Sequence, residues 1–253
     1  MTTHSAATPQ HATTPPAPLL VLIPGHWLGA WAWDEVRAHL SASRIDAVAL
    51  TLPGLDPADP LRADRTLSEQ VAAIRTAIEA QGAAGRRPVT IAAHSGANAP
   101  VSLLLDQFPA LVQRVIWVDS GPVGPGTVFA PDLPAGVAEL PLPEFEALAA
   151  QASLAGLSDA ALARFRERAV PQPGPVLRQP VELTNPARCA VPTTLVCCSI
   201  PSAQVLELAR GGHPMFAEVA ALTALRTVDL PTGHWPMWSA PGALAEILLA
   251  EIA

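Results

Sequence analysis

The stretch from Pro88 to Pro100 constrains the fold of this chain more than any other. It reads Pro-Val-Thr-Ile-Ala-Ala-His-Ser-Gly-Ala-Asn-Ala-Pro: a short apolar run typical of a β-strand, small residues around a serine, and then a helix-length segment from Gly96 to about Gln107. A strand and a helix joined by a sharp turn with serine at its tip is the context of a nucleophile elbow. So tight a turn strains the backbone and requires small residues two positions before and after the serine, where this chain has Ala93 and Ala97. A simpler interpretation also fits: Ser95 could be only the N-cap of a helix that follows a buried strand.

The rest of the chain alternates apolar runs of strand length with amphipathic segments of helix length. Strands are predicted at 19–23, 47–52, 89–92, 115–118, 193–198 and 225–230, and helices at about 31–40, 66–81, 96–107, 203–209, 214–222 and 241–252. This alternation predicts an α/β fold with a mostly parallel sheet of about six strands and helices on both faces. Ligands of such a sheet bind at the carboxyl ends of its strands.

Composition narrows the class of protein further. Half of the 253 residues are hydrophobic, which is enough to bury a sizeable core in one domain. The formal net charge of −7 argues against nucleic acid as a partner, and no apolar run is long enough to predict a membrane span. All basic residues are arginines, so lysine chemistry is excluded. The three cysteines fit neither a disulfide framework nor a zinc site, which favours a reducing, cytoplasmic location.

Two segments depart from the alternating pattern. Residues 1–18 are rich in Thr, Ala, Pro and His, have no apolar core typical of a signal peptide, and are expected to form a disordered leader before a domain spanning 19–253. Residues 121–188 contain many prolines and glycines and two helical pieces, near 144–154 and 158–169, with no clear strand. We expect this second segment to be a helical cap inserted into the domain.

A serine becomes a useful nucleophile only when a base takes its proton, and histidine is the usual base. Of the seven histidines, His234 is the best candidate because it stands in the loop between the last strand and the last helix. His94 precedes the serine directly, so its side chain should point away from the serine. The alternative for His234 is a solvated loop residue with no catalytic task.

Four motifs, taken in order, carry a resemblance to a known family. They are Ile-Pro-Gly-His-Trp-Leu-Gly-Ala-Trp-Ala-Trp (23–33), Leu-Pro-Gly (52–54), Ala-His-Ser-Gly-Ala (93–97) and Gly-His-Trp-Pro (233–236). Together they resemble the α/β-hydrolase fold superfamily, in its cap-bearing group of plant esterases, salicylate-type methyl esterases and hydroxynitrile lyases. The resemblance implies catalysis without a metal or other cofactor, and a triad in the chain order serine, acid, histidine.

The acid of the triad is where the sequence departs from the family. Most members carry an aspartate just after the strand equivalent to 193–198, and here that position reads Ser-Ile-Pro-Ser. Some members place the acid after the preceding strand, which here ends at Asp119. We therefore expect Asp119 to orient His234, with Glu207 as the second candidate. A turn residue without function is the alternative for Asp119.

The remaining site residues are expected from position and resemblance. The backbone N–H of Gly96, at the start of a helix, should form one half of an oxyanion hole. The resemblance implies the N–H of His26 as the other half, although Pro24 replaces the histidine common in the family. Four aromatic residues in loops could line an apolar substrate pocket or merely pack the cap onto the core: Trp27, Phe129, Trp235 and Trp238.

The sequence thus predicts a serine hydrolase that cleaves a carboxylic ester or lactone of a fairly apolar small molecule through an acyl-enzyme. One alternative is a lyase or natural-product tailoring enzyme that uses the same residues as an acid–base relay. Another is a small-molecule binder without catalysis. Neither nucleic acid nor a membrane is an expected partner.

Overall fold

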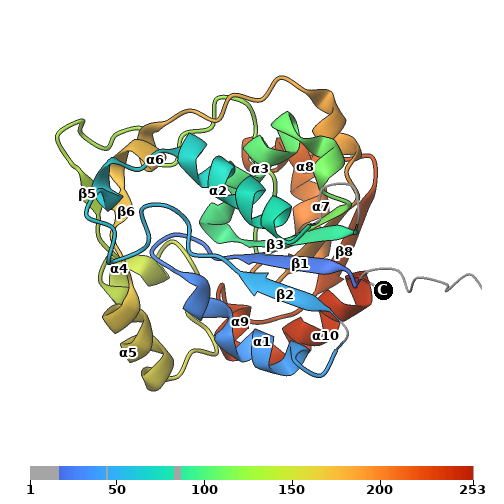
Figure 1. The fold of residues 1–253 in the computed structure, drawn as a ribbon, viewed down its shortest axis with the longest axis horizontal. Coiled ribbons are helices and arrows are strands. Elements are labelled where there is room, and N and C mark those ends of the chain that lie inside the picture. Colours follow the sequence, from blue (N-terminus) through green and yellow to red (C-terminus); the bar gives the residue numbers. More distant parts are fainter. Residues whose placement is uncertain (1–16, 44, 83–86, 253) are drawn as a thin grey trace, which may run out of the picture.

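The computed structural model describes residues 17–43, 45–82 and 87–252, and a single six-stranded sheet organises them (Figure 1). The strands lie in the order β2-β1-β3-β4-β7-β8, and every neighbouring pair is parallel. The sheet confirms the predicted α/β class and the six predicted strands. Their bounds are β1 Leu19–Ile23, β2 Asp46–Ala49, β3 Val89–His94, β4 Arg114–Val118, β7 Thr193–Cys197 and β8 Leu225–Asp229.

Helices cover both faces of this sheet, as an all-parallel sheet requires. In Figure 1, α1 (Asp34–Leu40), α9 (Pro236–Ser239) and α10 (Pro241–Ile252) lie on one face. The other face carries α2 (Leu67–Ala80), α3 (Asn98–Gln107), α7 (Ser202–Arg210) and α8 (Ala217–Ala221).

The apolar residues of β1 pack into the hydrophobic cores on both faces of the sheet. Successive side chains of a strand point to opposite faces. Accordingly Leu20 and Leu22 pack with the α1 and α10 side, while Val21 joins the core beneath α2 and α3. Because both faces are covered, the strand is apolar at every position.

The start of α2 follows the capping-box signal in the sequence. The backbone N–H of Glu69 donates to Thr66 Oγ1 at 3.3 Å, and the N–H of Thr66 donates to Glu69 Oε2 at 2.8 Å. The helix therefore begins at Leu67, within one residue of its predicted start.

The segment between β4 and β7 is an insertion of mixed structure. It contains α4 (Phe145–Ala149), α5 (Asp159–Arg168) and α6 (Gly174–Arg178), but also β5 (Glu139–Leu140) and β6 (Gln172–Pro173), which pair antiparallel. The two short strands were not predicted, because two-residue strands are too short to show a period in the sequence. The predicted leader lies almost wholly outside the described residues.

Smaller differences concern short helices in predicted loops. The loop predicted after β8 contains α9, and several single 3₁₀ turns connect the longer elements. In the described part of the chain, the 3₁₀ turns are Ala30–Trp33, Arg62–Asp64, Ser95–Ala97, Pro109–Leu111, Pro186–Ala190 and Pro214–Phe216.

Among the described residues no helix combines the length and apolarity needed to cross a bilayer.

Candidate active site

Ser95 lies at the tip of the turn between β3 and α3, in a strained backbone conformation. Its φ of +49° falls in the left-handed region, which is uncommon for residues other than glycine and costs of order 1–3 kcal/mol. The loop after β1 passes so close that a Cβ on Gly25 would lie 2.8 Å from the Cβ of Ser95. The Ser95 side chain caps neither the 3₁₀ turn nor α3. This geometry matches a nucleophile elbow rather than a simple N-cap.

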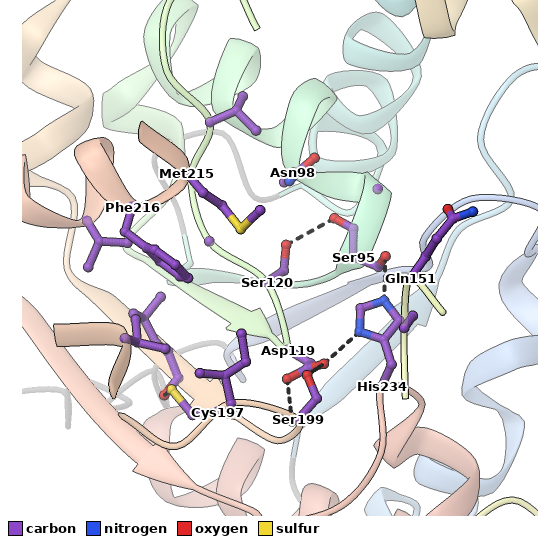
Figure 2. A pocket seen from close by; sticks show the side chains of 18 of the residues that line it. Ser95, Asn98, Asp119, Ser120, Gln151, Cys197, Ser199, Met215, Phe216 and His234 are labelled. Carbon is purple, nitrogen blue, oxygen red and sulfur yellow. Dashed lines mark hydrogen bonds and ion pairs between the residues drawn. The ribbon is translucent and has the colours of Figure 1, made fainter. Parts of the chain in front are cut away.

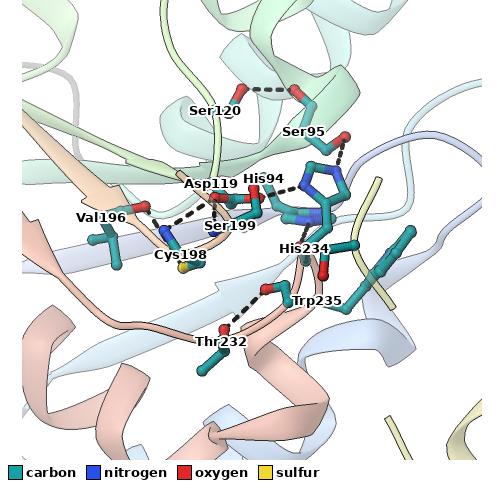
Figure 3. Close-up of polar contacts among 12 residues, drawn as sticks. His94, Ser95, Asp119, Ser120, Val196, Cys198, Ser199, Thr232, His234 and Trp235 are labelled. Atoms are coloured by element: carbon teal, nitrogen blue, oxygen red, sulfur yellow. Dashed lines mark hydrogen bonds and ion pairs between the residues drawn. The ribbon is translucent and has the colours of Figure 1, made fainter. Parts of the chain in front are cut away.

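Three side chains from distant parts of the chain form one hydrogen-bonded series (Figure 3). His234 Nε2 lies 2.7 Å from Ser95 Oγ, and His234 Nδ1 lies 2.6 Å from Asp119 Oδ2. Ser95 follows β3, Asp119 follows β4 and His234 follows β8, so the carboxyl edge of the sheet brings them together. Glu207, the second candidate acid, is exposed on α7 and is not the partner of His234.

The carboxylate of Asp119 accepts four hydrogen bonds. Besides His234, it accepts from the N–H groups of Cys198 at 3.0 Å and Ser199 at 2.8 Å, and from the Ser199 hydroxyl at 2.6 Å. Burial raises the pKa of this carboxyl, but the hydrogen bond and charge of His234, with the Ser199 donors, outweigh burial and lower the pKa to about 2. Asp119 is therefore an anion at neutral pH, suited to orient an imidazole.

The backbone of His234 is fixed from two sides. Its N–H donates to the carbonyl oxygen of Ser153 at 2.7 Å, and its carbonyl oxygen lies 2.7 Å from His94 Nε2. Since a carbonyl oxygen only accepts, the proton of neutral His94 resides on Nε2. Burial, and then the charge of His234, lower the pKa of His94 to about 3, so this ring stays neutral.

Sequence reasoning missed the residues that support this series. It excluded His94 as a base but did not predict that His94 would hold the loop of His234. Ser199 stands where most family members carry the acid, and this position could have indicated that Ser199 lies next to the triad. Ser120 also escaped notice; its hydroxyl donates to the carbonyl oxygen of Ser95 at 3.0 Å.

Gly96 and His26, whose N–H groups are predicted to form an oxyanion hole, lie in close contact. A Cβ on Gly96 would lie only 2.1 Å from Cδ2 and 2.3 Å from Nε2 of His26, so the imidazole packs directly on Gly96. Within the described part of the chain, neither N–H donates to another protein group. Burial, and then the charge of His234, lower the pKa of His26 to about 4, so this ring is neutral as well.

Replacing Gly96 by alanine is expected to lower kcat for ester substrates by about 100-fold, the effect of losing one oxyanion donor. The new methyl group would force the His26 ring, and with it the His26 N–H, out of place. Steady-state kinetics would measure the change. Gly136→Ala is the matched control, because its Cβ would meet open space. Wild-type kcat in Gly96→Ala would contradict this arrangement of donors.

The two buried histidines predict a loss of stability in mild acid. Folding lowers the pKa of both from 6.5, so below that value the unfolded chain binds more protons than the folded one. Between pH 6.5 and about 4, each should reduce the free energy of unfolding by about 1.4 kcal/mol per pH unit. Urea unfolding at several pH values measures this slope. His94→Gln should make this slope shallower, whereas the substitution of an exposed histidine, His213→Gln, should not. An unchanged slope in His94→Gln would contradict the assignment of His94 as a buried, neutral histidine.

A cavity of about 780 Å³ opens above Ser95 and His234 (Figure 2). Of the four aromatic residues predicted to line it, only Phe129 does so. The prediction is wrong for Trp27, Trp235 and Trp238, which are buried in the core on the α1 and α10 side. Trp27 lies in the loop after β1, Trp235 directly precedes α9 and Trp238 lies on α9, and all three belong to one buried hydrophobic cluster. Trp27 Nε1 donates to the carbonyl oxygen of Leu140, and Trp238 Nε1 to that of Ala32, each at 3.0 Å.

An elbow serine, a carboxylate after β4 and a histidine after β8, placed on a parallel six-stranded sheet, define the class of α/β-hydrolase fold proteins. The chain belongs to the alpha/beta hydrolase family, whose family model matches residues 20–247.

Solved structures of the same fold include three informative neighbours. An extracellular alpha/beta-hydrolase from a Paenibacillus species, described as sharing structural and functional homology with tobacco Salicylic Acid Binding Protein 2, has 19% identity and a TM-score of 0.72 over 92% of this chain and 98% of its own. The methylesterase MES16 from Arabidopsis has 17% identity and a TM-score of 0.67 over 92% and 98%. Tomato Methylketone Synthase I complexed with 2-tridecanone has 16% identity and a TM-score of 0.70 over 93% and 97%. Comparison with curated protein sequences gives no match.

Proposed function

We propose that this protein is a serine hydrolase that cleaves carboxylic esters or lactones of small molecules through an acyl-enzyme. The single observation that carries the proposal is the series Ser95–His234–Asp119, with contacts of 2.7 and 2.6 Å, at the floor of a large cavity. Base, nucleophile and orienting acid lie within hydrogen-bond reach of one another, which is the geometric requirement for nucleophilic catalysis.

In this mechanism His234 Nε2 takes the proton of Ser95 as Oγ attacks the substrate carbonyl carbon. Asp119 keeps His234 in the tautomer with its proton on Nδ1 and stabilises the imidazolium that forms. The N–H groups of Gly96 and His26 stabilise the oxyanion. His234 then gives its proton to the leaving alcohol. Water, activated by the same histidine, attacks the acyl-enzyme and releases the acid and free Ser95.

The comparisons support a hydrolase in general terms and leave room for one rival. Two neighbours are named a methylesterase and a pyrethroid hydrolase, the latter from Sphingobium faniae, with 18% identity and a TM-score of 0.64 over 93% of this chain and 97% of its own. Another is named a methylketone synthase. That name favours, as a second candidate, a lyase-type reaction in which His234 relays protons and Ser95 is never acylated.

Two assays together test the proposal. The protein should hydrolyse p-nitrophenyl acetate, and a fluorophosphonate probe should label wild type at Ser95 and leave Ser95→Ala unlabelled. Labelling without turnover of any ester or lactone would favour the lyase-type reaction. Neither labelling nor turnover would favour a small-molecule binder and would overturn the proposal.

A further inference from the structure

The cavity extends well beyond the catalytic side chains, toward α7 and α8. This part, here called the α7–α8 arm, is lined by residues from β7, the loop after it, α7, the next 3₁₀ turn and α8: Cys197, Ile200, Val205, Phe216 and Val219. In Figure 2, Cys197, Met215 and Phe216 lie on the far side of Ser120 from His234, whereas Gln151 lies on the side of His234. The cavity therefore extends in two directions from the catalytic side chains.

The α7–α8 arm offers no charge to a ligand. Its thiol stays protonated at neutral pH, because burial, and then the negative charges of Asp229 and Asp119, raise the pKa of Cys197 to about 12. No lysine or arginine lines the cavity, all of whose lining residues lie in the described part of the chain. Its remaining ionisable groups, Asp119 and His234, already bond each other. A carboxylate placed in the arm would lose its hydration without gaining a partner.

The position of His234 determines which part of an ester faces the arm. His234 must protonate the leaving alcohol, so that alcohol has to lie beside Nε2. The segment 149–154 lines the cavity there, and the carbonyl oxygen of Ser153 is bonded to the His234 N–H. With the alcohol against this segment and the carbonyl oxygen toward Gly96, the acyl group is left to extend past Ser120.

We propose that the α7–α8 arm is the acyl-group pocket and that the substrates are esters of uncharged, apolar acids. This inference rests on the proposed serine hydrolase function and adds its substrate class. Met215 lines the cavity yet is 72% exposed, so the arm reaches solvent beside this side chain. A flexible methionine at the opening accommodates acyl chains of different lengths.

Two isomeric esters test which end of the substrate enters the α7–α8 arm, because they contain the same atoms. Methyl octanoate carries its chain on the acyl side, and heptyl acetate, with the same atoms, carries it on the alcohol side. A pH-stat assay of the wild-type protein should give a kcat/KM at least tenfold higher for methyl octanoate, since each buried methylene contributes roughly three- to fourfold. Equal values, or faster cleavage of heptyl acetate, would overturn the proposal.

A substitution on α8 locates the effect in the arm. Val219→Phe fills the arm and should reduce the preference for methyl octanoate over heptyl acetate at least about tenfold. Ala220→Phe is the matched control: it adds the same ring one residue along the same helix, at an exposed position outside the cavity lining. Ala220→Phe should keep the wild-type preference. A preference unchanged in folded Val219→Phe would contradict the assignment.

A charged ester tests the arm without any variant, in case Val219→Phe does not fold. Methyl hydrogen succinate should be cleaved at least about tenfold less efficiently than methyl butyrate, because its carboxylate would lie unpaired in the arm. Equal efficiency would overturn the proposal. Turnover of p-nitrophenyl acetate distinguishes failure of the acyl-pocket proposal from failure of the proposed hydrolase function. If it is hydrolysed but these preferences are absent, only the acyl pocket is wrong; if no ester is hydrolysed, the proposed function fails first.

Discussion

Replacing Ser95 by alanine is expected to lower kcat for p-nitrophenyl acetate by about 10⁴-fold or more, the largest effect of any single substitution in this protein. The hydroxyl that attacks the carbonyl is then absent, and His234 Nε2 loses its partner at 2.7 Å. Cavity and oxyanion donors remain, so the residual rate should still exceed the rate in water. The measurement is steady-state hydrolysis with purified protein.

Removal of a nearby serine provides the control for Ser95→Ala. The Ser102 hydroxyl is buried on α3 and accepts a hydrogen bond from the N–H of Val123 at 3.2 Å, away from His234. Ser102→Ala should therefore affect the free energy of unfolding more than kcat. A Ser95→Ala variant that retains more than a tenth of the wild-type kcat would contradict the assignment of the nucleophile.

Replacing Asp119 by asparagine is expected to lower kcat by about 10⁴-fold while the fold is kept. A neutral amide can donate to His234 Nδ1, which favours the tautomer with its proton on Nε2, and that tautomer cannot accept the proton of Ser95. The same change removes the negative charge that stabilises the imidazolium. Ser199→Ala deletes only one of the donors to Asp119 and should have a much smaller effect.

Glu207→Gln is the matched control for the acid, because Glu207 was the other carboxylate that the sequence allowed. It is exposed on α7, so its substitution should leave kcat and KM at their wild-type values. Loss of activity in Glu207→Gln, together with an active Asp119→Asn, would reverse the assignment of the acid.

The sequence predicted the sheet well because each central strand is buried on both faces. The run Leu19–Ile23 is apolar at every position, and Val89–Ala92 is apolar except for the buried Thr90; such runs have few alternative structures. Parallel strands also bring their carboxyl ends to one edge, so residues at these ends could be expected to meet. Ser95 was predicted from its elbow motif, His234 from its loop after the last strand and Asp119 from the family resemblance. All three follow strands of the sheet, and the structure brings their side chains together.

The sequence predicted the surroundings of the site less well, because side-chain direction in a loop depends on tertiary packing. Trp235 and Trp238 seemed as well placed for the cavity as Phe129, yet both turn into the core against Phe165, with ring centroids 5.5 and 5.1 Å from it. The contact of His94 with the His234 backbone spans 140 positions along the chain, and no local pattern encodes it. The same holds for the apolar arm, whose lining comes from four separate elements.

Intact-protein mass spectrometry after rapid mixing with p-nitrophenyl octanoate can detect the proposed acyl-enzyme at Ser95. We expect an adduct of one octanoyl group, located at Ser95 by peptide mapping, that appears with a burst of p-nitrophenol and disappears as octanoate is released. The adduct should be absent from Ser95→Ala. Product formed at the wild-type rate without any octanoyl adduct, or an adduct on another residue, would contradict covalent catalysis by Ser95.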